Sequence, residues 1–159
     1  MGLTVLFVGF GAVAKCCASI WPSMVKKIKK INMTKAVIVE PKALHMEYDI
    51  PSWMHGIYTH IQIALDENNY KKTLDELQLK YNFDLVVDLS VNVDGLCMVK
   101  WVQENKILYV NTALEDWESY KTWNEENRKI NLDGKKGSEQ RSELKEHTLI
   151  HRHIRIKHK

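Results

Sequence analysis

The stretch VLFVGFGAVA at residues 5–14 decides the fold, because two glycines interrupt an apolar run in a fixed pattern. The β-branched and aromatic residues before the glycines predict a strand that is buried on both faces. In the pattern G-x-G-x-x-A, formed by Gly9, Gly11 and Ala14, the first glycine permits a tight turn and the second leaves room for a pyrophosphate. The small alanine lets the following helix pack closely on the strand. The stretch therefore predicts a nucleotide site at a strand-to-helix turn.

A second interpretation of the same stretch is a secretory leader, with Ala12-Val13-Ala14 as its cleavage site. A leader begins with positive charge, whereas residues 1–14 contain no Lys or Arg, so we favour the nucleotide site. The longest apolar stretch, residues 3–14, is too short to span a bilayer. We therefore expect a soluble protein that does not contact a membrane.

Length and composition predict one folded domain followed by a basic tail. The chain has 159 residues, 45% of them hydrophobic, which is enough for one core. Residues 128–159 hold ten Lys or Arg against four Asp or Glu, and their apolar residues are sparse. We expect a folded domain at 1–123 and a basic, His-rich and poorly ordered tail at 124–159. The three cysteines form no CxxC pair, which favours a reducing compartment, the cytoplasm.

Strand-like and helix-like patterns alternate through the first 123 residues. The expected strands are 3–9, 35–40, 56–65, 83–91 and 107–114, and the expected helices are 12–30, 66–82 and 94–106. Pro22 predicts an interruption or a kink in the first helix. Strands joined by helices of this length make right-handed crossovers. The fold class predicted is α/β, with a Rossmann-like, doubly wound parallel sheet of about five strands.

Glu40 is the last residue of the second expected strand. A carboxylate at this position accepts hydrogen bonds from both ribose hydroxyls of an adenosine. It also repels a 2′-phosphate, so the sequence predicts NAD rather than NADP as the cofactor. The alternative is that the glycines form an ordinary turn and that Glu40 is a surface acid.

Three longer segments carry a resemblance to a known family, and together they cover roughly residues 1–120. They are VLFVGFGAVAKCCASIWPSM, ENNYKKTLDEL and NFDLVVDLSVNVDGLCMVKWVQENKILYVNTALEDWESY. These segments resemble the N-terminal NAD-binding domain of homospermidine synthase, in the saccharopine dehydrogenase-like group. The resemblance implies polyamine biosynthesis: oxidoreductase and transferase chemistry in which bound NAD helps move an aminobutyl group from putrescine or spermidine through an imine.

The resemblance also implies roles for individual residues. The cofactor-binding residues would be Gly9, Gly11, Ala12 and Val13 at the pyrophosphate, Glu40 at the ribose, and Ser90, Val91, Asn92 and Thr112 at two further strand ends. Glu115 and Trp117 would bind the polyamine substrate, and a carboxylate beside an indole face suits a diamine cation. Residue types alone favour a different interpretation, in which Glu115 belongs to a solvated acidic run and Trp117 packs on a loop, but the resemblance reverses that preference. No catalytic residue is predicted.

The family it resembles has a substrate domain after the Rossmann unit, and residues 121–159 do not resemble that domain. Three explanations stay open: a truncated or frameshifted product, one half of an enzyme that a complementary chain or a homodimer completes, or a domain kept for binding alone. Two functional classes therefore remain, a homospermidine synthase-like enzyme or part of one, and a non-catalytic nucleotide-binding or interaction module.

The tail offers two weaker hypotheses. His147, His151, His153 and His158 have a spacing that would gather a metal, but no Cys or acidic partner lies at a convincing distance, so a solvated tail is favoured and no metal is expected. A nucleic-acid partner is not favoured, because the tail has basic residues but no interleaved aromatic side chains. Such a role predicts salt-dependent binding that is lost when residues 128–159 are removed.

Overall fold

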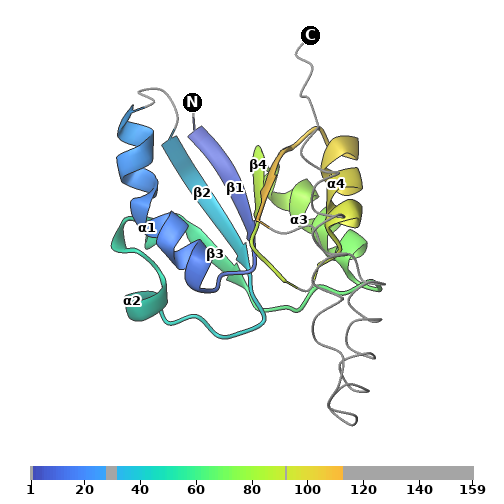
Figure 1. Cartoon of the computed structure of the whole chain (residues 1–159), viewed down its shortest axis with the longest axis horizontal. Coiled ribbons are helices and arrows are strands. Elements are labelled where there is room, and N and C mark those ends of the chain that lie inside the picture. The colour runs from blue at the N-terminus through green and yellow to red at the C-terminus, as the bar shows by residue number, and fades with distance from the viewer. Residues whose placement is uncertain (1, 28–31, 92, 113–159) are drawn as a thin grey trace, which may run out of the picture. The chain divides into compact units, whose positions relative to one another are not determined.

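A parallel five-stranded sheet forms the centre of the domain in the computed structural model (Figure 1). The structure describes residues 2–27, 32–91 and 93–112. The strands are β1 (Gly2–Val8), β2 (Asn32–Val39), β3 (Tyr58–Ile61), β4 (Leu85–Asp88) and β5 (Leu108–Asn111), in the order β3-β2-β1-β4-β5. The helices are α1 (Ala12–Lys27), α2 (Met46–Asp49), α3 (Tyr70–Tyr81) and α4 (Gly95–Glu104), with a 3₁₀ turn at Ser52–Met54. All strand pairs are parallel, which confirms the predicted doubly wound α/β fold.

Alternating side chains of β1 divide the core into two layers. Leu6 and Val8 pack with residues of α3 and α4, whereas Val5 and Phe7 pack with Ala14 of α1. Successive side chains of a strand point to opposite faces of the sheet. A continuous apolar run is therefore what a strand covered on both sides requires, and α1 lies on one face while α3 and α4 lie on the other (Figure 1).

Pro22 lies inside α1 without ending it, so the helix is not interrupted there, and the alternative of a kink stays a prediction. Proline lacks the N–H that would bond the carbonyl of Ala18, four residues earlier. The indole Nε1–H of Trp53 donates to that carbonyl instead, at 3.0 Å. A side chain from the 3₁₀ turn thus replaces the hydrogen bond that the proline removes.

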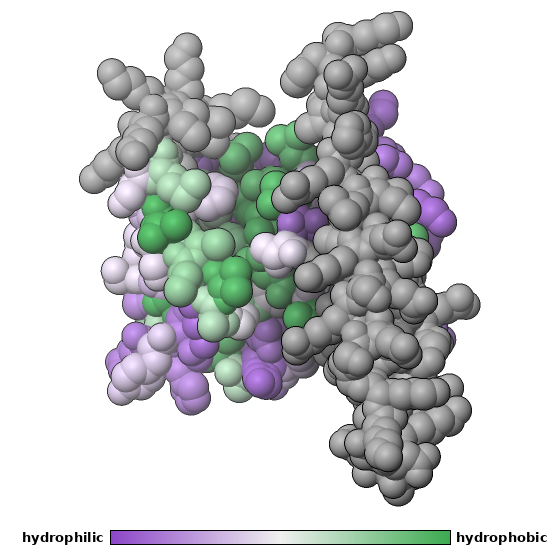
Figure 2. Space-filling model, viewed as in Figure 1, coloured by the Kyte–Doolittle hydropathy of each residue, from purple (hydrophilic) through white to green (hydrophobic). Residues whose placement is uncertain are grey.

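The two sides of α1 differ in residue size. Ala14 and Ala18 face the sheet and are completely buried, so the helix packs closely on it as the glycine motif predicts. Apolar residues also gather on the outer surface of α1 (Figure 2), where Val13, Ile20 and Met24 are each slightly more than half exposed. Single exposed apolar side chains are ordinary on protein surfaces.

The remaining expected elements are confirmed, mostly with shorter bounds. Leu74 and Leu77 form the buried face of α3, and Asp94 caps α4 by accepting a hydrogen bond from the Cys97 N–H at 2.9 Å. The sequence analysis did not predict α2 or the 3₁₀ turn. Each is about one turn long, so neither repeats a hydrophobic period that a sequence pattern would reveal.

Two other expectations concern the chain as a whole. The predicted domain boundary near residue 124 lies outside the described residues and stays a prediction. Within the described ranges, none of the helices combines the length and the apolar character needed to cross a membrane.

Candidate functional site

The carboxyl ends of four strands meet at one edge of the sheet. Val8 of β1 pairs with Val39 of β2 on one side and with Asp88 of β4 on the other, and Asp88 pairs with Asn111 of β5. The residues that follow these four positions are therefore neighbours along this edge. Ligands of open α/β sheets bind outside this edge, beside the strand where the order reverses, which here is β1.

Gly9, directly after β1, packs against the backbone of Ser90, which follows β4. Its φ of 80° is a backbone conformation that side chains with a Cβ rarely adopt. A Cβ at this position would lie 2.9 Å from both the N and the Cα of Ser90. The Gly9 N–H also donates to the Val39 carbonyl at 2.9 Å. The fold itself thus requires a glycine at this position.

Gly11 lies at the start of α1 and differs from Gly9 in both respects. A Cβ built on it meets no atom of the described structure within 4 Å, and its φ lies outside the left-handed region. Ala12, Val13 and Ala14 begin α1, whereas the next N–H, that of Lys15, already donates to the Gly11 carbonyl at 3.0 Å. The N–H groups of a first helical turn have no carbonyl partner within the helix, and together with the helix dipole they favour an anion.

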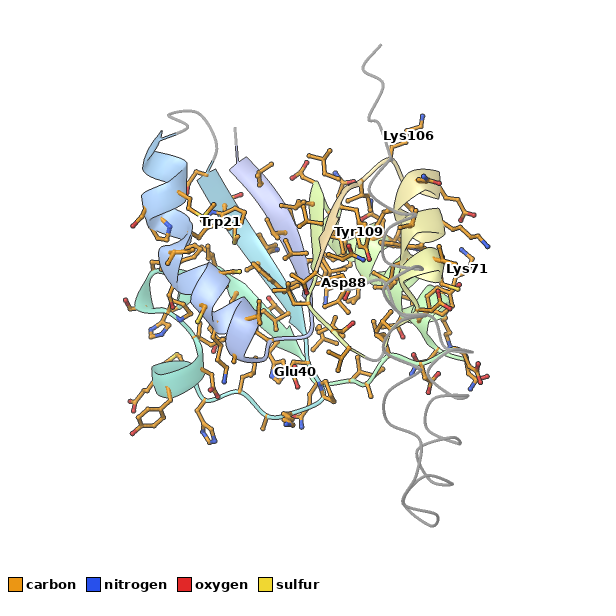
Figure 3. The ribbon with its side chains drawn as sticks, viewed as in Figure 1. Trp21, Glu40, Lys71, Asp88, Lys106 and Tyr109 are labelled. Atoms are coloured by element: carbon orange, nitrogen blue, oxygen red, sulfur yellow. The ribbon has the colours of Figure 1, made fainter. Side chains whose placement is uncertain are left out.

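Glu40 follows β2 and faces the glycine turn. Its Oε2 accepts the Phe10 N–H at 2.8 Å, and its Oε1 accepts the Lys42 N–H at 3.1 Å. The side chain is half-buried at the edge of the sheet (Figure 3). An ionised carboxylate has about four acceptor positions. Two of them are used by groups of the described residues, which leaves acceptor capacity for two ligand hydroxyls within this part of the chain.

Asp88, at the end of β4, is the most enclosed acid of the described residues, with only 4% of its surface exposed. Its Oδ1 accepts the Ser90 hydroxyl at 2.7 Å and the Ser90 N–H at 3.1 Å, and its Oδ2 accepts the Tyr109 hydroxyl at 2.9 Å (Figure 3). Burial raises the pKa of Asp88, and the hydrogen bonds from Ser90 and Tyr109 counteract part of that rise. Burial and the nearby Asp88 raise the pKa of Tyr109.

The other predicted cofactor residues lie along the same edge where the structure describes them. Ser90 is half-buried and bound to Asp88, Val91 is 61% exposed, and Thr112 is exposed just after β5. Three further groups of predicted residues lie outside the described residues: Asn92, the pair Glu115 and Trp117, and the histidines of the tail.

Two contacts between residues distant in sequence have no local sequence pattern that predicts them. Asp88 was part of the DLSVNVDG segment but received no role, and its partner Tyr109 lies 21 residues away. Lys15 of α1 binds Asp49 of α2 in an ion pair, and this hydrogen bond is the main cause that lowers the pKa of Asp49. An acid directly after the apolar core of a strand is the one sequence signal that could have pointed to Asp88.

Comparison with known proteins places the chain in a family. Residues 5–147 match the family described as "Saccharopine dehydrogenase NADP binding domain". None of the curated proteins compared with the chain matches it. The match covers most of the sequence and all of the strand ends described above, and the parallel sheet has the Rossmann-type architecture expected of a nucleotide-binding domain. The chain belongs to the saccharopine dehydrogenase NADP binding domain family.

Proposed function

We propose that this domain binds a dinucleotide at the carboxyl edge of its sheet, with the pyrophosphate over Gly11 and the adenosine ribose at Glu40. Gly11 is the observation that carries the proposal. Neither its backbone conformation nor its packing requires a glycine, because a Cβ there would meet open space within the described structure. Gly56 shares this freedom, but Gly11 lies at the start of α1 beside the carboxyl edge of the sheet, where a ligand that approaches the backbone closely explains a glycine.

The chain's own groups supply the binding chemistry. The first N–H groups of α1 and the positive end of its dipole stabilise the pyrophosphate. Glu40 has acceptor positions left for two ribose hydroxyls, and its carboxylate is already held by Phe10 and Lys42. Ser90, Val91 and Thr112 line the rest of the edge, towards the nicotinamide half. The nicotinamide of such a cofactor accepts and returns a hydride.

We further propose that NAD is preferred to NADP. The name of the family contains NADP, but the acid at Glu40 supports the opposite preference in this member. In NADP a 2′-phosphate would lie beside the Glu40 carboxylate, and these two negative charges would repel each other. NADP also lacks the 2′-hydroxyl that would donate a hydrogen bond to Glu40.

The test is calorimetric titration of the purified full chain with NAD and with NADP. Gly11→Val should weaken NAD binding about ten-fold or more, because the side chain fills the space of the pyrophosphate. Gly56→Val is the matched control, since Gly56 is also an exposed glycine with no described atom within 4 Å of a built Cβ. Equal affinities of the wild type and the Gly11→Val variant would contradict the site.

The preference for NAD is tested with Glu40→Gln, which keeps the shape of the side chain and removes its charge. We expect the ratio of NAD to NADP affinity to fall about ten-fold, equivalent to about 1.4 kcal/mol. An unchanged ratio would show that Glu40 does not select the cofactor. Urea denaturation of each variant confirms that the fold is intact.

A narrower proposal concerns the reaction, and the sequence resemblance supports it. We propose that the domain serves a homospermidine synthase-like enzyme, in which Glu115 and Trp117 bind the amine. The NAD-loaded chain should then bind putrescine or spermidine more tightly than butylamine, which has one charge only, and Glu115→Gln and Trp117→Leu should each weaken that binding. Absence of diamine binding by a chain that does bind NAD would favour the non-catalytic nucleotide-binding module.

A further inference from the structure

The turn that carries Glu40 is held from the neighbouring strand by side chains as well as by backbone. The ladder between β2 and β3 pairs Ile38 with His60 and Val39 with Ile61, and it is extended by the Glu40 N–H, which donates to the Ile61 carbonyl at 3.2 Å. The next group in the chain is the Glu40 carbonyl, which lies 2.9 Å from Nε2 of His60. The last backbone hydrogen bond of the ladder is the one from the Glu40 N–H, and the His60 imidazole provides the next hydrogen bond, to the Glu40 carbonyl.

The chemistry of this contact fixes the state of the imidazole nitrogen. A carbonyl oxygen only accepts hydrogen bonds, so Nε2 of His60 carries a proton and donates it to Glu40. Gln62, two residues further along, lies on the same side of an extended chain and donates its Nε2–H to the Pro41 carbonyl at 3.2 Å. Two consecutive carbonyls of the turn are thus held by two side chains of one segment.

The remaining freedom of Glu40 is small. The residue before a proline is restricted to extended conformations, and Pro41 follows it. At the other end of the same residue, Phe10 and Lys42 hold the two carboxylate oxygens. Backbone and carboxylate are each held by two contacts, although Glu40 is only half-buried and carries a flexible side chain.

We propose that His60 is a positioning residue for cofactor selectivity, which acts by anchoring the backbone of Glu40 so that its carboxylate is pre-placed for the ribose hydroxyls. The inference rests on the proposed NAD site and adds to it a residue that does not contact the ligand. Pre-placement reduces the ordering that binding would otherwise require. It also keeps the negative charge where a 2′-phosphate would lie, so both the affinity for NAD and the discrimination against NADP depend on it.

The first test is a binding cycle on the full chain. His60→Leu removes the donor and keeps an apolar side chain of similar bulk, whereas His60→Gln keeps an N–H donor. We expect His60→Leu to weaken NAD about five-fold, the effect of one ordinary hydrogen bond, and to lower the ratio of NAD to NADP affinity by a similar factor. His60→Gln should restore most of both. In a Glu40→Ala background, His60→Leu should change NAD affinity by less than about two-fold.

A second measurement needs no nucleotide. Amide hydrogen exchange should be faster in His60→Leu at Phe10 and Lys42, whose N–H groups bond the Glu40 carboxylate. It should be unchanged at Gly9, whose N–H bonds the Val39 carbonyl. A general loss of stability would instead raise exchange at all three amides.

The outcomes separate this inference from the proposed function. A wild-type chain that binds neither nucleotide would overturn both. If the wild type prefers NAD, two results would overturn the role of His60 alone. The first is a His60→Leu variant with unchanged selectivity, and the second is a loss of NAD affinity from His60→Leu that is equally large in the Glu40→Ala background. Selectivity that falls in His60→Leu, returns in His60→Gln and is insensitive to His60 in the Glu40→Ala background would establish the role.

Discussion

Two carboxylates stand on either side of β1 at the same edge of the sheet, and their surroundings give them different roles. Glu40, after β2, is half-buried and is held by backbone N–H groups of loops. Asp88, at the end of β4, is almost completely buried and is held by Ser90 and Tyr109. Glu40 keeps acceptor positions on its accessible side, whereas Asp88 is enclosed by its partners. A position at a strand end does not by itself make an acid a ligand-binding group, because burial decides whether a ligand reaches it.

The largest expected effect is on stability, at Asp88. Asp88→Ala leaves the hydroxyl of Tyr109 and the two donors of Ser90, all partly buried, without their acceptor, so the free energy of unfolding should fall by about 3 kcal/mol. Glu40→Ala should lower it by less than about 1 kcal/mol, because Phe10 and Lys42 can bond water instead. Urea denaturation of both variants measures the difference. Equal losses would mean that the two acids play the same structural part.

Gly9 extends the comparison to the glycines of the motif. Gly9→Ala should lower the free energy of unfolding by about 2 kcal/mol, because φ is positive and the new Cβ would lie 2.9 Å from the Ser90 backbone. Gly56→Ala is the control and should be close to neutral. Since Asp88 holds Ser90 against Gly9, the double variant Gly9→Ala/Asp88→Ala should lose less stability than the two losses added together. Strict additivity would separate Gly9 from the Asp88 contacts.

The strand ends that carry Gly9 and Glu40 are the part of this edge that the sequence alone predicts. The positions of Gly9 and Glu40 directly after two strands were predictable, because a strand is recognisable as an apolar run. The alternation of elements gave the sheet and its parallel pairing in the same way. These features depend on local patterns, so the parallel sheet and the edge where the carboxyl ends of its strands meet followed from them, whereas the order of the strands did not.

The contacts that distinguish Glu40 from Asp88 were not predictable. Tyr109 reaches Asp88 from another strand, and His60 reaches Glu40 from 20 residues away, so neither contact has a local sequence pattern. Pro22 is a similar case. Its effect on α1 depends on Trp53, which supplies the missing hydrogen bond from 35 residues along the chain. Side-chain partners distant in sequence are set by packing, which a single sequence does not reveal.

Trp21 of α1 and Trp53 of the 3₁₀ turn offer a smaller test of the same principle. The hydrogen-bond partner of a buried polar group decides what that group contributes to stability. The Nε1–H of Trp53 bonds the Ala18 carbonyl, whereas the buried Nε1 of Trp21 has no hydrogen-bond partner in the structure described. Trp53→Phe should therefore lower the free energy of unfolding by about 1 kcal/mol more than Trp21→Phe. In a Pro22→Ala background the Ala18 carbonyl regains a helical N–H, so the excess should shrink. An excess that persists there would come from packing instead.

The smallest expected effect is a pH dependence, and its sign tests the environment of Asp88 directly. The pKa of Asp88 is raised above its ordinary value of 3.8 by burial. At pH values between the pKa of Asp88 in the unfolded chain and its higher pKa in the folded chain, the folded chain binds more protons. This group therefore lowers the free energy of unfolding as pH rises from about 4 towards neutrality. The stability of the wild type minus that of Asp88→Asn should fall over this interval in urea denaturation series.

Asp49 is the matched control, because its pKa is lowered, chiefly by the hydrogen bond from Lys15. The stability that Asp49 contributes is present above the ordinary value of 3.8 and is lost as pH falls below it. The stability of the wild type minus that of Asp49→Asn should therefore rise with pH, at pH values below about 4. If the Asp88 difference instead rose with pH, the hydrogen bonds from Ser90 and Tyr109 would outweigh burial. Asp88 would then be an anion stabilised by its partners, and enclosure alone would separate the two acids.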